Sequence, residues 1–426
     1  MLSGPGGVAS RLRPLLEPLF GGDLPIRIRA WDGSEVGPAG APTAVIAHRR
    51  ALRRLLWQPD ELGLAQAYVT GELDVDGDLL DAFTRLWSVA RERDLHLTRP
   101  PARDLAAAAV TALRLGVVGP KPKAPASQAK VTGRLHSLVR DRAAIRHHYD
   151  LSNAFYALLL DDHLAYSSAY WVDPDGTLEQ AQEEKLALVC RKVGLQSGMR
   201  LLDVGCGWGS LSLYAAEHVG ARVVGVTLSA AQQAFVQQRV DERGLAGRVE
   251  IRLQDYRDVS DGPYDAVASI EMGEHVGQDN YPAYVAQLHR LVRPGGRVLI
   301  QQMSRGDRYP GGGPFIESYI APDMYMRPVG ETVAFVERGG LEVRDVHAMR
   351  EHYVRTVEAW LATFEENHEE VVSLVGEEVA RVWRLYLVGG LLTFREGRMG
   401  VDQILAVRPL PDGTSGLPLV RDDAAW

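Results

Sequence analysis

Short apolar runs rich in β-branched residues alternate with helical patterns between residues 200 and 301. The strand-like runs cover residues 200–204, 222–227, 249–253, 265–270 and 297–301, and the clearest helical patterns cover 230–243 and 281–291. This alternation predicts a mainly parallel β-sheet with helices on both faces, since parallel strands need a crossover connection. A ligand of such a sheet is expected at the carboxyl ends of its strands.

The first strand-like run leads into a glycine-rich turn, LLDVGCGWGS, from Leu201 to Ser210. Glycines at every second position permit a tight turn and a close approach of the backbone to a ligand. The pyrophosphate-binding pattern GxGxxG would need a glycine at Ser210. A nucleoside without phosphates therefore fits the loop better than a dinucleotide, although such a turn also serves as a plain connection between strand and helix.

The next two strands end in side chains that suit the rest of a nucleoside. The second strand ends at Thr227, Leu228 and Ser229, where nucleotide-binding folds usually place an acid for the ribose. The third is followed by Asp255 and Tyr256, a carboxylate and an aromatic face that suit an adenine amine and ring. Each is equally typical of a surface when taken singly, but at the ends of successive strands they predict one pocket.

The chain of 426 residues is long enough for two domains. We expect a small α+β domain over residues 1–115, with strand-like residues 26–31 and helical segments at 48–57, 61–70 and 79–90. Residues 117–128 concentrate Pro, Gly, Ala and Lys, which indicates an extended linker over 116–139. The alternating pattern then belongs to a second domain, residues 140–426.

Charge and composition restrict the partners of the chain. A net charge of −8 argues against general nucleic-acid binding. Eight basic residues stand against one acidic residue between Arg114 and Arg146, which predicts either contact with anionic lipid or a solvated face. No uncharged apolar run reaches the roughly 18–20 residues that span a bilayer. The two cysteines, Cys190 and Cys206, form no disulfide framework, so we expect a cytoplasmic location.

Six linked motifs carry a resemblance to a known family. They are HHYDLSN from His147, YSSAYW from Tyr166, the GCGWG loop, GVTLS from Gly225, QDYRD from Gln254 and EHVG from Glu274. In this order they resemble the cyclopropane fatty acid synthase family of methyltransferases over about residues 140–405. The first domain is similar more loosely, through GLAQAY from Gly63, and is expected to be lipid-associated. The resemblance implies a class I, Rossmann-like fold with an antiparallel last strand.

The resemblance implies S-adenosylmethionine as the cofactor and an unsaturated phospholipid acyl chain, or a mycolic acid on a carrier, as the substrate. We expect peripheral contact with the inner face of the membrane and a homodimer. The cofactor-binding residues that it implies are Tyr166, Ser167, Asp203, Gly205, Gly207, Thr227, Leu228, Gln232, Asp255 and Tyr256.

Glu274 follows the fourth strand, where a site carboxylate would receive a proton, although an acid here also suits a helix N-cap. In the family, the matching glutamate helps to hold a bicarbonate that acts as base, together with a cysteine, a histidine and a tyrosine. Tyr353 matches the tyrosine, but Ser168 replaces the cysteine and Gln301 the histidine. Glutamine cannot carry a proton, so bicarbonate would be held less firmly or be replaced by Glu274 itself.

Other residues near these motifs have weaker assignments. His148 is a further catalytic candidate, while the pair His147 and His148 orders a loop more readily than it binds a metal, and no metal site is expected. Aromatic faces stabilise a carbocation without capturing it, and the candidates are Tyr149, Tyr170, Tyr319 and Tyr353. Residues 309–328 form either a mobile lid or an ordinary connecting loop.

The altered base site bears on the product. Prompt loss of a proton from the new methyl group closes a cyclopropane, whereas a delay allows a hydride shift and gives a methylene branch. We hypothesise a 10-methylene acyl chain, which in a related branch of the family a partner reductase converts to a methyl branch. The alternatives are a cyclopropane-fatty-acyl-phospholipid synthase, a small-molecule methyltransferase, and a lipid-binding protein without activity.

Overall fold

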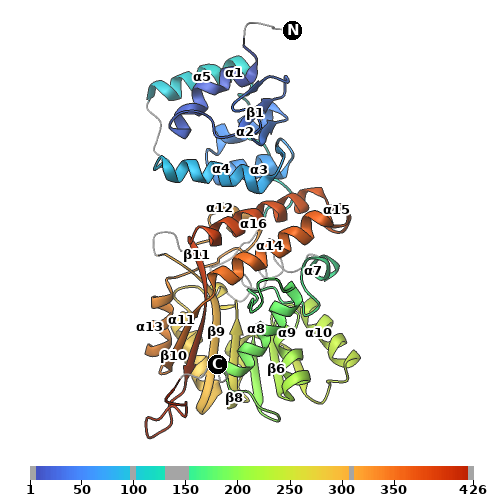
Figure 1. Cartoon of the computed structure of the whole chain (residues 1–426), viewed down its shortest axis with the longest axis vertical. Coiled ribbons are helices and arrows are strands. Elements are labelled where there is room, and N and C mark those ends of the chain that lie inside the picture. Colours follow the sequence, from blue (N-terminus) through green and yellow to red (C-terminus); the bar gives the residue numbers. More distant parts are fainter. Residues whose placement is uncertain (1–5, 96–101, 130–152, 307–310, 421–426) are drawn as a thin grey trace. The chain divides into compact units, whose positions relative to one another are not determined.

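The computed structural model describes residues 6–95, 102–129, 153–306 and 311–420 (Figure 1). Within it the chain forms two compact units. The first comprises Met1–Gln128 and Gly376–Leu392, and the second comprises Ala129–Val375 and Thr393–Trp426. In the described part of the chain, no helix is both long enough and apolar enough to cross a bilayer.

The first unit is an α+β domain built on a four-stranded sheet of order β2-β1-β3-β4. β1 pairs in parallel with β3, while β2 and β4 run antiparallel to their neighbours. Its strands are β1 Arg27–Ala30, β2 Glu35–Val36, β3 Thr43–Ile46 and β4 Leu73–Asp76. Its N-terminal helices are α1 Val8–Leu16, η1 Glu17–Phe20, α2 Arg49–Trp57, α3 Glu61–Val69, α4 Leu79–Glu92 and α5 Ala102–Leu115.

Local sequence sets the helix starts in this unit. The side chains of His48, Asp60 and Asp78 accept hydrogen bonds from the first backbone N–H groups of α2, α3 and α4, which no earlier turn can satisfy. A buried ion pair ties α2 to the sheet, because the guanidinium of Arg54 lies 2.7 Å from the carboxylate of Glu72. The predicted helices of this domain are therefore present, and their bounds follow from their caps.

A helix from far along the chain completes the first unit. Helix α16, Glu377–Arg395, places Arg381 so that it donates to the carbonyl of Tyr68 at 2.6 Å and pairs with Asp74 at 3.1 Å. We expected these residues in the second domain, because nothing local in them points to a partner more than 300 residues away.

Residues 116–128 contain no helix or strand, and several of them contact α2. Arg53 donates to the carbonyl of Val117 at 2.8 Å, and Trp57 to that of Gly119 at 2.9 Å. Arg54 also donates to the carbonyl of Lys123, at 2.8 Å. The part of the expected linker that the structure describes is thus extended and bound to α2, and residues 130–139 lie outside the described residues.

The second unit holds a seven-stranded sheet of order β10-β11-β9-β8-β5-β6-β7. The strands from β9 to β7 are parallel, whereas β11 is antiparallel to both β9 and β10. The mainly parallel sheet with an antiparallel last strand is therefore confirmed. The strands are β5 Arg200–Val204, β6 Arg222–Thr227, β7 Val249–Leu253, β8 Tyr264–Ile270, β9 Val292–Arg305, β10 Glu342–Ala348 and β11 Met399–Val407.

Helices cover both faces of this sheet (Figure 1). On β5, Leu201 packs into one core cluster and Leu202 into the other, because successive side chains of a strand point to opposite faces. Helices α8 Leu178–Lys192, α9 Ser210–Tyr214 and α10 Ala230–Glu242 cover the first face. Helices α11 Tyr281–Leu291 and α13 Val329–Arg338 cover the second.

Further helices of the second unit carry residues discussed below. They are α7 Asn153–Leu159, α12 Pro314–Tyr319, α14 Arg350–Glu366 and α15 His368–Val375, with short helical turns η2 Ala215–Val219, η3 Tyr256–Asp258 and η4 Gly273–His275. Of the segment 309–328, where the sequence left open a lid or an ordinary loop, the described residues include α12.

Gly209 holds the start of α9 against α10. Its φ is +81°, and a Cβ atom there would lie 2.5 Å from the Cγ1 of Val236. We predict that Gly209→Ala lowers the free energy of unfolding by about 2–4 kcal/mol, combining left-handed strain with overpacking. Gly244→Ala is the matched control, since its φ is +66° but nothing lies within 4 Å. Urea unfolding that gives equal losses for both variants would contradict this packing.

Candidate active site

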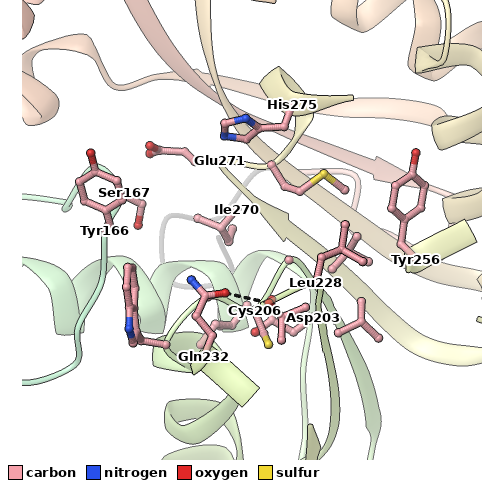
Figure 2. A pocket seen from close by; sticks show the side chains of 18 of the residues that line it. Tyr166, Ser167, Asp203, Cys206, Leu228, Gln232, Tyr256, Ile270, Glu271 and His275 are labelled. Carbon is pink, nitrogen blue, oxygen red and sulfur yellow. Dashed lines mark hydrogen bonds between the residues drawn. The ribbon is translucent and has the colours of Figure 1, made fainter. Parts of the chain in front are cut away.

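A pocket lies at the carboxyl ends of β5, β6, β7 and β8, where the parallel sheet predicts it (Figure 2). It encloses about 1350 Å³, part of which is open to solvent. All ten cofactor-binding residues predicted from the sequence line it, among them Asp203 and Gly207. Figure 2 shows Tyr166, Ser167 and Glu271 on one side of the pocket and Tyr256 on the other. The structure therefore brings these ten residues together in one pocket, and their binding of a cofactor stays a prediction.

The glycine loop after β5 forms the floor of the pocket. Gly205 has a φ of +81°, and a Cβ atom there would lie 2.9 Å from the Cγ of Met272. Nothing lies within 4 Å of the equivalent position on Gly207, which lines the pocket. The loop thus gives a ligand close access to the backbone, and a larger residue at Gly205 would push into Met272, which follows β8.

The end of β6 presents neutral polar groups. The hydroxyl of Thr227 donates to Oε1 of Gln232 at 2.7 Å, and both residues line the pocket (Figure 2). After β7, the carboxylate of Asp255 accepts from the guanidinium of Arg257 at 2.7 and 2.8 Å. Polar atoms of strands that are adjacent in the sheet therefore surround one space, as a nucleoside requires.

Lys185 is a pocket residue that the sequence analysis missed. It lies on α8, is 1% exposed, and its Nζ donates to the hydroxyl of Ser167 at 2.9 Å. Burial lowers the pKa of the Lys185 ammonium to about 8, while the charges of Asp161, Glu271 and Asp203 act in the opposite direction. Burial likewise raises the pKa of Asp203 to about 6. In sequence, Lys185 resembles any surface lysine of a charged helix.

Glu271, which the sequence analysis did not single out, is the carboxylate that meets the predicted catalytic residues. Its Oε1 accepts from the backbone N–H of Ser168 at 2.8 Å and from Nε2 of Gln301 at 2.9 Å. Its Oε2 accepts from the hydroxyl of Tyr353 at 2.7 Å. Glu271 also lines the pocket. The fold therefore brings three predicted catalytic residues together around a carboxylate that was not predicted and that faces the cavity.

The backbone and a neighbouring strand fix this arrangement. Glu271 follows β8 with a φ of +50°, and its N–H donates to the carbonyl of Gln301 at 2.6 Å. On β11, Nε2 of Gln403 donates to Oε1 of Gln301 at 2.9 Å. This bond leaves the amide nitrogen of Gln301 facing Glu271. Burial raises the pKa of Glu271, although its hydrogen bonds oppose the shift.

Glu274 has different surroundings from those expected. It lies in the turn η4 with no exposed surface and is absent from the pocket wall. One of its oxygens accepts from the backbone N–H of Met303 at 2.5 Å. Burial raises the pKa of Glu274 to about 8, and the negative charge of Glu271 adds to the shift. Its catalytic role stays a prediction. Ser168, Gln301 and Tyr353, which were expected to share a site with Glu274, donate hydrogen bonds to Glu271.

The other predicted residues are scattered. Tyr170 packs against His352, with 4.7 Å between ring centroids, and Tyr319 packs against Phe315 at 5.5 Å. His147, His148 and Tyr149 lie outside the described residues. Of the aromatic candidates that the structure describes, Tyr353 is the one that contacts Glu271.

An aromatic cluster that the sequence did not predict borders the pocket. Trp360 on α14 is 1% exposed and lies between Tyr166 and Tyr353, with centroid distances of 5.4 and 6.0 Å. Phe394 stacks on the other side of Tyr353, at 4.4 Å. No motif marks Trp360, because its neighbours come from elements distant in sequence.

The fold and the pocket define a class I methyltransferase. The chain is similar to a "Probable fatty acid methyltransferase" of Pseudomonas putida, with 37% identity over 97% of this chain and 99% of the relative. It is also similar to the "Tuberculostearic acid methyltransferase UfaA1" of Mycobacterium tuberculosis, with 34% identity over 91% of this chain and 89% of the relative.

A solved structure agrees with these relatives. The mycolic acid cyclopropane synthase CmaA1, complexed with SAH and CTAB, covers 62% of this chain and 97% of its own length, with 33% identity and a TM-score of 0.59. The family model described as mycolic acid cyclopropane synthetase matches residues 136–404. The chain belongs to this family of S-adenosylmethionine-dependent methyltransferases, which confirms the predicted family and cofactor.

The raised pKa of Glu274 predicts a pH dependence of stability. Its folded-state pKa of about 8 lies above its ordinary value of 4.5, so the folded state binds the proton more tightly. The free energy of unfolding should therefore fall as pH rises through this window. Glu274→Gln stays neutral and should gain Tm over the wild type progressively from pH 5 to pH 8. Thermal unfolding at several pH values measures this, and a constant offset would contradict it.

Proposed function

We propose that this enzyme transfers a methyl group to the cis double bond of an unsaturated phospholipid acyl chain and releases a methylene-branched chain. The observation that supports this best is that the glycine loop and the carboxylate of Glu271 line one cavity. A donor site and a proton acceptor are what methylation of an alkene needs, since the carbocation that results must lose a proton.

The residues of the pocket fit the donor that the family uses. Gly205 and Gly207 leave room for it, and Thr227, Gln232 and Asp255 surround its nucleoside part. When bound, the donor supplies a methyl group on a positively charged sulfur. Leu164, Ile270, Met272 and Val276 add apolar surface to the same cavity, which suits an alkyl chain and excludes water.

The aromatic cluster suits a cationic acyl chain. Tyr166 lines the cavity and packs against Trp360, which packs against Tyr353. Aromatic faces stabilise a cation by about 0.5–2 kcal/mol each without forming a bond to it. A small polar acceptor would need a polar pocket wall instead, and the apolar residues beside Glu271 therefore favour a lipid.

Two observations support the methylene product over the cyclopropane. Ser168 and Gln301 stand where the cyclopropane-forming pattern has cysteine and histidine, so the surroundings of the proton acceptor differ. The relatives that span nearly the whole chain are named as fatty acid and tuberculostearic acid methyltransferases. A partner reductase would then act on the product.

Incubation with a 13C-methyl donor and dioleoyl phosphatidylglycerol tests this function. We predict labelled lipid whose proton NMR spectrum contains vinylidene signals. Distearoyl phosphatidylglycerol is the control and should take up no label, because it has no double bond. Cyclopropane signals without vinylidene signals would establish the runner-up, a cyclopropane synthase. Donor binding without any labelled lipid would favour a protein that binds lipid without turnover.

The first unit carries a surface that suits an anionic membrane, and we assign the peripheral contact to it. Leu113 is 66% exposed, Val118 is 55% exposed and Trp57 is 54% exposed. The indole N–H of Trp57 donates to the carbonyl of Gly119, which places Trp57 beside Val118, the preceding residue. Arg114 and Lys121 are both exposed and lie near Leu113 and Val118 in the sequence, where they add positive charge. Exposed apolar side chains among cations match the interface of an anionic bilayer.

Sedimentation with anionic vesicles tests this surface. We predict that Trp57→Ser with Leu113→Ser weakens binding to dioleoyl phosphatidylglycerol vesicles by about tenfold or more, since partial burial of these side chains contributes about 1–2 kcal/mol. Val346→Ser is the control, because Val346 is 42% exposed on β10 of the other unit. Equal binding by the double variant and the wild type would contradict the assignment.

A further inference from the structure

We propose that Glu271 is itself the proton acceptor of the reaction, and that its carboxylate takes the place of the bicarbonate ion that the family resemblance implies. This inference rests on the proposed function. It adds that the base is part of the chain, so that turnover needs no dissolved bicarbonate.

The hydrogen-bond donors that would hold bicarbonate are already bonded to the carboxylate of Glu271. The N–H of Ser168 and the amide of Gln301 both donate to Oε1 of Glu271, and the hydroxyl of Tyr353 donates to Oε2. The hydroxyl of Ser168 donates instead to the carbonyl of Ala169, at 3.1 Å. A carboxylate has the planar shape and charge of bicarbonate. Glu271 therefore satisfies these donors without a second anion.

The backbone of Glu271 points to a function for its side chain. A φ of +50° is left-handed, a conformation that glycine adopts freely and that costs other residues about 1–2 kcal/mol. Glu271 pairs its N–H with the carbonyl of Gln301 in this conformation. A residue held in strain beside a cavity, where glycine would be relaxed, is typical of a functional site. The strained backbone directs this carboxylate toward the three donors.

The position of Glu271 allows it to reach the substrate. It lines the cavity together with Gly205 of the donor loop and Ile270 of β8. Lys185, whose ammonium interacts with the charge of Glu271, lines the same cavity. Of the residues that donate to Glu271, Ser168 and Gln301 are fully buried, so the carboxylate faces the cavity from a rigid support.

The chemistry balances with the groups present. The π electron pair of the alkene forms the new bond to the methyl carbon, while the bond between that carbon and sulfur breaks and its electrons stay on sulfur. A hydride then shifts from the methyl-bearing carbon to the neighbouring cationic carbon, which moves the positive charge to the methyl-bearing carbon. A C–H bond of the new methyl group breaks, its electron pair forms the carbon–carbon π bond of the methylene branch, and its proton goes to Glu271. The proton leaves Glu271 for solvent before the next turnover, so no further reactant is needed.

Two variants at one position test this assignment. Glu271→Gln keeps the shape of the side chain but cannot accept a proton, and we expect it to lose about 10²–10⁴-fold in kcat, the usual contribution of a general base. Glu271→Gly removes the carboxylate at a φ that glycine prefers, so its fold is not put at risk. We expect that added bicarbonate binds this variant and restores part of its activity.

The assays use argon-purged buffer, either with no added bicarbonate or with bicarbonate added over roughly a 10-fold range of concentration. The ionic strength is held constant so that screening of charges is equal in all of them. 13C NMR titration with labelled bicarbonate gives a readout that does not depend on turnover. The wild type should show equal activity with and without bicarbonate and no binding, whereas Glu271→Gly should bind it. Glu184→Gln removes an exposed carboxyl group from α8, outside the pocket, and serves as the control variant that should keep its activity within a few-fold.

The outcomes separate this inference from the proposed function. Absence of lipid product with the wild type under all conditions would overturn the function. Product that forms with the wild type only when bicarbonate is present would leave the function standing and overturn the inference. Full activity of Glu271→Gln would also overturn it. Failure of bicarbonate to bind Glu271→Gly would show that the side chain does not fill an anion site.

Discussion

A single carboxylate, that of Glu271, joins the parts of the second unit that surround the pocket. Ser168 precedes α8, Gln301 belongs to β9 and Tyr353 to α14, and all three donate to it. The first and the last of these donors lie more than 180 residues apart, so the three converge only when the sheet and its covering helices are assembled. Three hydrogen bonds to one anion, two of them from fully buried residues, fix its place more firmly than any loop contact would.

The buried ammonium of Lys185 interacts with the charges of three carboxyl groups, those of Asp161, Glu271 and Asp203. Asp161 accepts from two backbone N–H groups, and Asp203 accepts from the hydroxyl of Ser212 at 2.7 Å. Glu274 avoids the cost of a second negative charge beside Glu271 by remaining protonated at neutral pH, because its pKa is about 8. Glu271 accepts from three donors and also lines the cavity, in a region that attracts a positively charged donor.

Sequence patterns predicted the strands, turns and pocket position that depend on neighbouring residues. They missed the residues whose role depends on tertiary contacts. The bounds of β5, β6 and β7 and the glycine turn follow from local periodicity and glycine spacing, and the pocket follows from the strand ends. Glu271, Lys185 and Trp360 carry no such signal, since each acts through partners brought together by the fold. The positive φ of Glu271 is likewise invisible in the sequence. Nothing in the sequence indicates that α16 packs with the first unit, because its contacts there, among them those of Arg381 with Tyr68 and Asp74, join residues distant in the chain.

The arrangement around Glu271 is the claim on which the account of catalysis depends, and a crystal structure tests it most directly. Crystals of the wild type should be grown with the demethylated donor product in buffer that contains bicarbonate. The account predicts electron density for both oxygens of Glu271 within hydrogen-bonding distance of Ser168, Gln301 and Tyr353, with no other anion among them. A separate planar anion held by these three residues, with Glu271 turned away from them, would contradict it.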